Sequence, residues 1–174
     1  TATVDDRALI SASIMSKKLA AGDKNIVLDV KCGSGAFMKT YEDAKKLAET
    51  MVNIGKRCGR NIMAVITNMD EPLGRNIGNA LEVIEAVDVL RGGGDKDLRE
   101  LSVTLAANML SLSFGKDTDE CMEEATKALD SGRAFDKFRE LVEAQGGDVD
   151  YIIDTHRFKK DKCVRDIVSP DDGY

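Results

Sequence analysis

The chain has 174 residues, 43% of them hydrophobic, which is enough for one domain with a buried core. Its formal net charge of −6 argues against nucleic acid or an anionic membrane as the main partner, because both attract basic surfaces. A charged small molecule remains a candidate ligand, since a local cluster of side chains can override the overall sign.

Three further absences in the sequence narrow the class of protein. No run of residues approaches the apolar length of a membrane-spanning helix, and the first residues lack the basic-then-apolar pattern of a signal peptide. The cysteines are scattered with no CxxC spacing, which suits reduced thiols better than a disulfide framework or a zinc site. We therefore expect a cytoplasmic protein.

Residues 5–22 predict a helix that Asp5 or Asp6 caps and that Gly22 ends. The pattern also allows this first helix to belong to a different unit from the rest of the chain.

One face of this helix mixes apolar and polar residues. Ile10, Ser13, Ile14 and Lys17 follow the spacing i, i+3, i+4, i+7 and therefore share that face. In the simpler interpretation Lys17 lays its stem on apolar surface and keeps its charge in water. In the alternative, the face is a pocket floor, with apolar walls for a flat ring and two donors for its carbonyl oxygens.

The next segments predict a β-α-β unit. Residues 25–31 and 61–69 are short runs rich in apolar and β-branched residues, typical of strands covered on both faces. Between them, residues 40–59 predict a strongly amphipathic helix with Thr40 as its cap. A unit of this length predicts parallel strands joined by a right-handed crossover.

The turn after the first strand, in the stretch VLDVKCGSGAF, carries several signals. Strand alternation places Asp29 and Lys31 on one side, at the carboxyl end where open α/β sheets bind ligands. Gly33 and Gly35 allow backbone amides to approach a phosphate closely, although most such turns are only tight connections. Phe37 follows them directly.

Residues 70–78 form a loop with a proline and two glycines before the next helix. Glu82 and Glu85 lie three residues apart on that helix, so their carboxylates can share a face. Loop carbonyls and one carboxylate would suit a hard cation, whereas a solvated acidic face is the alternative. The only histidine, His156, lies in a charged segment and is assigned no chemistry.

The second half of the chain is mainly helical. Helices are predicted over residues 79–92, 97–115, 117–132 and 133–147. The helix over 97–115 is apolar on most sides and should be deeply packed. Residues 150–155 predict a strand or an extended segment. The sequence thus predicts a helix-rich α/β fold.

Four blocks of sequence resemble one known family. They are TATVDDRALISASIMSKKLAAG, VLDVKCGSGAFMKTYEDAKKLAETMVNIGKRCGR, MDEPLGRNIGNALEVIEA and AQGGD, in this order over nearly the whole chain. They resemble the thymidine and pyrimidine-nucleoside phosphorylases. The resemblance implies that residues 1–22 are the last helix of a small helical domain and residues 23–174 part of the central nucleoside phosphorylase/phosphoribosyltransferase-type α/β domain.

The resemblance also implies roles for single residues. Ser13 and Lys17 match the serine and lysine that bind the pyrimidine, with Lys17 also stabilising the departing base. Ile10 and Ile14 match apolar walls beside the ring, and Phe37 matches the position near C5 of the base.

A bound potassium-like cation occurs in some similar bacterial enzymes. Leu73 and Asn76, through their carbonyls, and Glu85, through its carboxylate, match its ligands, although Asn76 replaces a usual small apolar residue. The family's base-binding arginine, its glycine-rich phosphate loop with the active-site histidine, and its C-terminal extension have no counterpart in the sequence. The resemblance therefore implies a fragment.

The implied function is cleavage of uridine, thymidine or deoxyuridine with inorganic phosphate, giving free base and a pentose 1-phosphate. The family implies a homodimer without an organic cofactor, and we expect the fragment alone to be inactive. A non-catalytic folded module and a phosphoribosyltransferase-like enzyme remain the alternatives.

Overall fold

The structure is a computed structural model that describes residues 6–159 and 163–171. Its elements follow one another in the order α1 (Arg7–Ala21), β1 (Asn25–Cys32), α2 (Tyr41–Arg57), β2 (Asn61–Asn68), α3 (Asn79–Leu90), α4 (Lys96–Phe114), α5 (Thr118–Asp130), α6 (Arg133–Ala144), α7 (Asp150–Ile153) and the 3-10 helix η1 (Thr155–Arg157). The fold is therefore α/β and rich in helices, as predicted.

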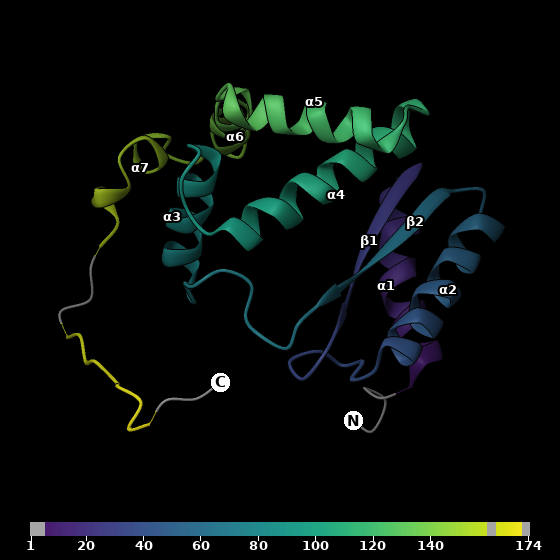
Figure 1. Cartoon of the computed structure of the whole chain (residues 1–174). Coiled ribbons are helices and arrows are strands. Elements are labelled where there is room, and N and C mark those ends of the chain that lie inside the picture. The colour runs from purple at the N-terminus through teal and green to yellow at the C-terminus, as the bar shows by residue number, and fades with distance from the viewer. Residues whose placement is uncertain (1–5, 160–162, 172–174) are drawn as a thin grey trace.

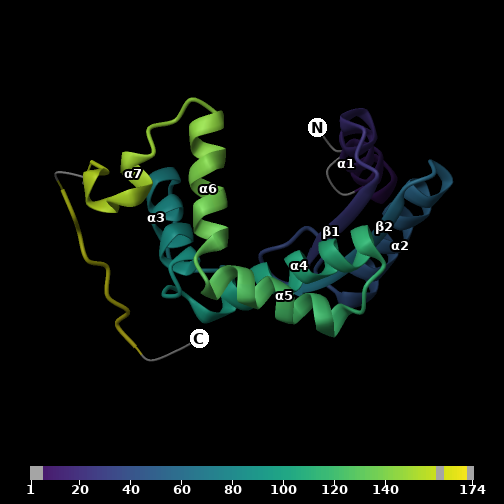
Figure 2. The same ribbon diagram turned by 90° about the horizontal axis from the view of Figure 1, so that it is seen from above.

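The two strands pair in parallel, in a register that runs from Asn25 opposite Asn61 to Cys32 opposite Asn68. Helix α2 connects them and contacts both strands, and α1 packs against α2. Helix α4 contacts the sheet as well and lies across it from α1 and α2 (Figures 1 and 2). The predicted parallel β-α-β unit is confirmed.

The main core lies between the sheet, α1 and α2. Ile26, Leu28 and Val30 alternate along β1 and are buried, and they pack against buried residues of α2 such as Leu47 and Met51. The side chains between them on β1 point to the opposite face, because successive strand residues alternate. The apolar periodicities of the sequence thus describe the packed faces correctly.

Both predicted helix caps in this half of the chain are confirmed. The Asp6 carboxylate accepts hydrogen bonds from the amides of Ala8 and Leu9, at 2.8 and 3.1 Å. Gly22 ends α1 in the left-handed region, with φ of 82°. The Thr40 hydroxyl accepts from the amide of Asp43 at 3.2 Å.

The expectation that the helix over 97–115 is deeply packed is wrong. Among the residues of α4, only Ala107 is buried, within a small cluster that also holds Cys121 and Ala125 of α5. Met109 and Phe114 are 52% and 70% exposed. Helix α4 contacts α5 and the sheet, and these neighbours do not surround it, so part of its apolar surface faces solvent.

The predicted strand over 150–155 is also wrong. The carboxylate of Asp148 accepts a hydrogen bond from the amide of Asp150 at 2.9 Å. The short helix α7 begins there and is followed by η1. Ile152 is buried there, and the guanidinium of Arg91 donates to its carbonyl at 3.1 Å. The segment contacts α3, far from the sheet, so no strand is available to pair with it (Figure 1).

Helix α1 contributes to the same core as the sheet, through buried Met15 and half-buried Ile10 and Ile14. The predicted domain boundary after residue 22 stays a prediction. Along residues 6–159 and 163–171, no helix combines the length and apolar character needed to cross a membrane.

Candidate functional site

The glycine turn after β1 is held by the loop that follows β2. The amide of Ser34 donates to Oδ1 of Asp70 at 2.7 Å, and the amide of Gly35 donates to the carbonyl of Met69 at 2.8 Å. A Cβ on Gly33 would lie 2.6 Å from that same Oδ1, and Gly33 has a φ of 132°. The glycines therefore admit a neighbouring loop, and their amides are used within the protein, which favours the tight connection over a phosphate cradle.

Beside this turn lies a cavity of about 310 Å³ between α1, α2 and β1. Ile10, Ile14 and Phe37, three of the five residues predicted to bind a base, line it together. The remaining walls are mostly apolar and come from Asp29, Val30, Lys31, Gly35, Ala36, Met38, Leu47, Met51 and Met69. A volume at the lower end of the range for ligand sites suits a small planar group.

Phe37 is accessible within this arrangement. Its side chain is 72% exposed, whereas its neighbours Ala36 and Met38 are each 7% exposed. The backbone on either side is thus anchored in the core while the ring stays open to a ligand.

Ser13 and Lys17 lie on the exposed side of the isoleucine stripe and do not line the cavity. The ammonium group of Lys17 donates to the hydroxyl of Ser13 at 3.0 Å. This geometry agrees with the simpler interpretation, in which Lys17 keeps its charge in water. The predicted contacts of both residues with a base stay predictions.

The charged residues predicted at the carboxyl end of β1 form a compact cluster with a threonine of β2. The ammonium group of Lys31 lies 2.7 Å from Oδ2 of Asp29 and donates to the hydroxyl of Thr67 at 3.0 Å. That hydroxyl in turn donates to Oδ1 of Asp29 at 2.5 Å. The three groups satisfy one another, so the cluster ties the two strands together at the end where the turn begins.

The three residues predicted to hold a cation lie on, or next to, one loop. The carboxylate of Glu85 is 7% exposed and accepts the amide of Arg75 at 2.7 Å and, more weakly, the amide of Asn76 at 3.4 Å. Leu73 is 43% exposed on the same loop. Glu85 thus faces amide donors of the loop and anchors it by itself, and the cation stays a prediction.

Glu82 behaves differently from Glu85 although both stand on α3. Its exposed carboxylate accepts the amide of Gly78 at 3.0 Å and so closes the start of the helix. The two carboxylates therefore do not form one acidic face.

Asp95 caps α4 and faces the same loop. Its carboxylate accepts the amides of Leu98 and Asp97 and pairs with the guanidinium of Arg75 at 3.2 Å. These hydrogen bonds, with that from Leu98 the strongest influence, hold the pKa of Asp95 below its ordinary value.

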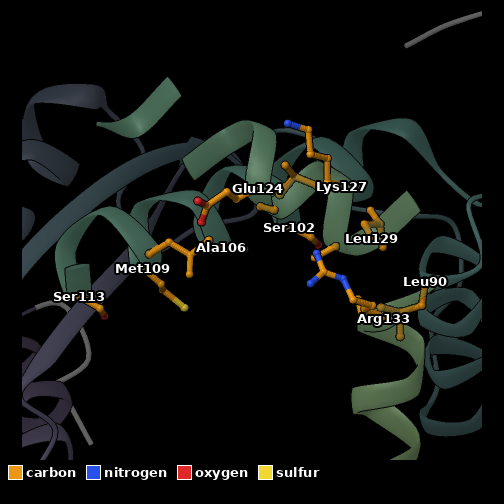
Figure 3. Close-up of a pocket in the computed structure, with 14 residues that line it drawn as sticks. Leu90, Ser102, Ala106, Met109, Ser113, Glu124, Lys127, Leu129 and Arg133 are labelled. Carbon is orange, nitrogen blue, oxygen red and sulfur yellow. The ribbon is translucent and has the colours of Figure 1, made fainter. Parts of the chain in front are cut away.

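A larger cavity of about 840 Å³ lies elsewhere, between α4, α5 and the start of α6 (Figure 3). Apolar side chains dominate its lining, and none of the predicted site residues reaches it. Two of its charged residues are paired: Glu124 with Lys116, and Lys127, which points outward in Figure 3, with Glu123 at 3.2 Å. With these two groups bonded to neighbours, this cavity is a weaker candidate for chemistry.

Sequence reasoning missed Met69 and Asp70 as parts of the site. A parallel pair places the residues after both strands at one edge of the sheet, but the packing decides which of them meet. The glycine turn after β1 required a close neighbour, and the loop after β2 was the nearest segment able to supply it.

The cysteines and other metal-binding side chains add no further site. Cys32, Cys58, Cys121 and Cys163 are free thiols, as expected. Within the described ranges, no group of three or more His, Cys, Asp and Glu side chains is placed to hold a metal ion.

Comparison with known proteins adds evidence from the sequence as a whole. A family described as "Glycosyl transferase family, a/b domain" matches residues 2–135. A protein of Staphylococcus aureus strain bovine RF122 / ET3-1, named pyrimidine-nucleoside phosphorylase, is 49% identical over 99% of this chain. A protein with the same name in strain USA300 is 48% identical. The chain covers 43% of the length of each, so it spans less than half of these relatives.

Proposed function

The chain belongs to the glycosyl transferase family with this a/b domain, and we propose that it forms the base-binding part of a pyrimidine-nucleoside phosphorylase. The reaction would cleave uridine, thymidine or deoxyuridine with inorganic phosphate into free base and ribose or deoxyribose 1-phosphate. The observation that carries the proposal is the cavity in which Ile10, Ile14 and Phe37 meet, in a chain half identical to enzymes of that name.

The cavity suits one half of this chemistry, which is recognition of the base. Its apolar walls would take the faces of the pyrimidine, and the open ring of Phe37 would contact one edge. Lys17 and Ser13, one helical turn apart and already bonded to each other, would turn toward the polar edge of the ring when a base is bound.

In the proposed reaction, phosphate attacks the anomeric carbon as the glycosidic bond breaks, and the bonding pair leaves with the base. Lys17 would stabilise the negative charge on the departing base, an interaction that grows toward the transition state. Ser13 would orient the ring. Among the described residues the glycine turn uses its amides internally, so the phosphate is expected to bind to groups outside this turn.

Binding by the 174-residue chain tests the base site directly. We expect uridine to shift the NMR signals of Ile10, Ile14 and Phe37 in a saturable titration, and Phe37→Ala to weaken binding by about tenfold, the scale of one aromatic contact. Phe114→Ala is a matched control, because Phe114 is similarly exposed, at 70% against 72%, and lies on α4 away from the cavity. Equal loss in both variants, or no binding by the wild type, would refute the proposed site.

Turnover is tested by a phosphorolysis assay with uridine or thymidine and excess phosphate. We expect no turnover from residues 1–174 alone. In a longer, active protein that contains them, Lys17→Ala should lower turnover by about a hundredfold or more, the scale of losing a charge-stabilising donor. Near-normal turnover of that variant would contradict the role of Lys17.

Phosphoribosyl transfer to an aromatic acceptor is the second candidate, because the matching family is described by glycosyl transfer in general. Product analysis separates the two reactions: a pentose 1-phosphate formed from nucleoside and phosphate supports phosphorolysis, whereas consumption of phosphoribosyl pyrophosphate supports the transferase. Failure of both reactions in the longer protein, with preserved uridine binding, would favour a non-catalytic base-binding module.

A potassium ion and a homodimer complete the proposal. Leu73 and Asn76 would offer carbonyl oxygens and Glu85 its carboxylate, which already lies against this loop. Sedimentation analysis would show whether the chain forms dimers, and a comparison of its stability in potassium and in tetramethylammonium chloride would test the ion.

A further inference from the structure

We propose that the Met69–Asp70 step after β2 completes the base cavity, with Met69 as a wall and Asp70 as the residue that positions the Phe37 turn. The inference rests on the proposed function, because it assigns these two residues to the pyrimidine site. Both follow the second strand, 36 residues or so along the chain from the turn they hold.

Asp70 holds the turn through two hydrogen bonds with Ser34, one to its side chain and one to its backbone, and these two bonds are the clasp. Its Oδ1 accepts the amide of Ser34 at 2.7 Å, and its carbonyl accepts the hydroxyl of Ser34 at 3.1 Å. The amide of Asp70 donates to the side-chain oxygen of Asn68 at 2.9 Å, and this bond orients the backbone of Asp70. A short hydrogen bond to a carboxylate is stronger than one between neutral groups, so Asp70 is a strong side-chain tie on this turn. The ammonium group of Lys39, which donates to the carbonyl of Ser34 at 2.6 Å, is a second one.

Met69 links the same two segments and also faces the cavity. Its amide donates to the carbonyl of Cys32 at 2.7 Å, and its own carbonyl accepts the amide of Gly35 at 2.8 Å. Its side chain lines the cavity with Phe37, and its Cγ would lie 3.3 Å from a Cβ on Gly35. A flexible thioether in this place can adapt to the face or edge of a bound ring.

The position of Phe37 depends on this clasp because its ring has little packing of its own. The ring is 72% exposed, so contacts of the side chain cannot fix it. What holds it is the backbone, pinned after it by buried Met38 and before it by the bonds of Ser34 and Gly35. Loosening the clasp should therefore move the ring and weaken base binding, although Asp70 itself touches no base.

Amide hydrogen exchange and uridine titration, measured by NMR on the same samples, test the two parts together. Asp70→Ala should raise the exchange rate of the Ser34 amide by about tenfold or more, the effect of losing a charge-assisted hydrogen bond, and weaken uridine binding by a similar factor. Asp70→Asn keeps a carbonyl oxygen as acceptor and should stay within about threefold of the wild type in both measurements. Glu71→Ala, an exposed neighbour, is the control and should change neither.

Met69→Ala tests the wall separately from the clasp. It removes the side chain from the cavity but keeps both backbone bonds, so we expect weaker uridine binding with unchanged exchange at Ser34. Unchanged uridine binding in this variant would remove Met69 from the site.

The outcomes distinguish this inference from the proposed function. If the wild type binds uridine and Asp70→Ala binds it equally well, the positioning role is refuted while the proposed function stands. If Ser34 exchanges at the same rate in Asp70→Ala and the wild type, the clasp itself is refuted. If the wild type binds no uridine, the proposed function fails, and the assignment of both residues to a pyrimidine site fails with it.

Discussion

Replacing Glu85 with alanine should destabilise the protein more than replacing Glu82, the other glutamate of α3. Glu85 is 7% exposed and, with Ser11, makes up the buried polar side chains of the described residues. Oε1 accepts the amide of Arg75 at 2.7 Å, whereas the bond from Asn76 to Oε2, at 3.4 Å, is long. The carboxylate therefore fixes the loop before α3 mainly through one strong, partly buried hydrogen bond.

The expected loss of stability follows from these two hydrogen bonds to Glu85. A hydrogen bond to a charged group contributes about 1.5–3 kcal/mol, and an amide left without an acceptor adds part of its desolvation penalty. The bond at 3.4 Å lies beyond the usual range and adds little. We expect Glu85→Ala to lower the free energy of unfolding by about 2–3 kcal/mol, and Glu85→Gln, which keeps one carbonyl oxygen, by roughly half as much.

Urea denaturation followed by circular dichroism measures the change, with a shifted midpoint at constant slope as the expected result. Glu82→Ala is the matched control, since Glu82 stands one helical turn away, is exposed and accepts a single amide at 3.0 Å. Its loss should cost below about 1 kcal/mol, the scale of a capping contact. Equal midpoints for Glu85→Ala and Glu82→Ala would show that the buried carboxylate does not anchor the loop.

The same titration tests the proposed potassium ion when it is repeated in potassium chloride and in tetramethylammonium chloride at equal ionic strength. A bound ion stabilises only the folded state, so the wild-type midpoint should be higher in potassium. The difference should vanish in Glu85→Ala. Equal wild-type midpoints in the two salts would contradict the ion.

Three shorter predictions concern single positions. Gly33→Ala should destabilise the protein by more than Gly59→Ala in urea titrations: both glycines have positive φ, but only at Gly33 would a Cβ lie 2.6 Å from a carboxylate oxygen. Cys121 should react with a thiol reagent far more slowly than exposed Cys58. Burial blocks access to Cys121 and raises the pKa of its thiol, so a smaller fraction is thiolate at any given pH. Equal reaction rates would contradict this. The pKa of Asp95 lies below its ordinary value, so its contribution to stability is complete above the ordinary carboxyl range and is lost as pH falls through the folded pKa. Asp95→Ala should therefore make the free energy of unfolding fall less steeply as the pH is lowered, measured by urea titrations at several acidic pH values.

Local features of the chain were readable from sequence because they depend on neighbouring residues. Asp6 and Thr40 cap their helices through amides two or three positions ahead. The apolar alternation of β1 and the stripe of α2 describe faces that the fold buries. The family was also readable, since four long blocks in a fixed order carry far more information than any single motif.

The sequence predicted structure less well where an element's conformation or burial depends on segments that are distant in the chain. Residues 150–155 predicted a strand or an extended segment, but they contact α3 far from the sheet and form the short helices α7 and η1 instead. Helix α4 is apolar on most sides, yet only contact with neighbours buries a surface, and its neighbours cover part of it.

The candidate site shows the same division. That Ile10 and Ile14 share a helical face, and that Phe37 follows a glycine turn, was evident from spacing alone. That Met69 and Asp70 stand against that turn, and that the carboxylate of Glu85 meets two loop amides, was decided by the tertiary structure. Spacing along the chain sets the direction of a side chain relative to its own backbone, whereas its partners are chosen by the packing of segments that are distant in sequence.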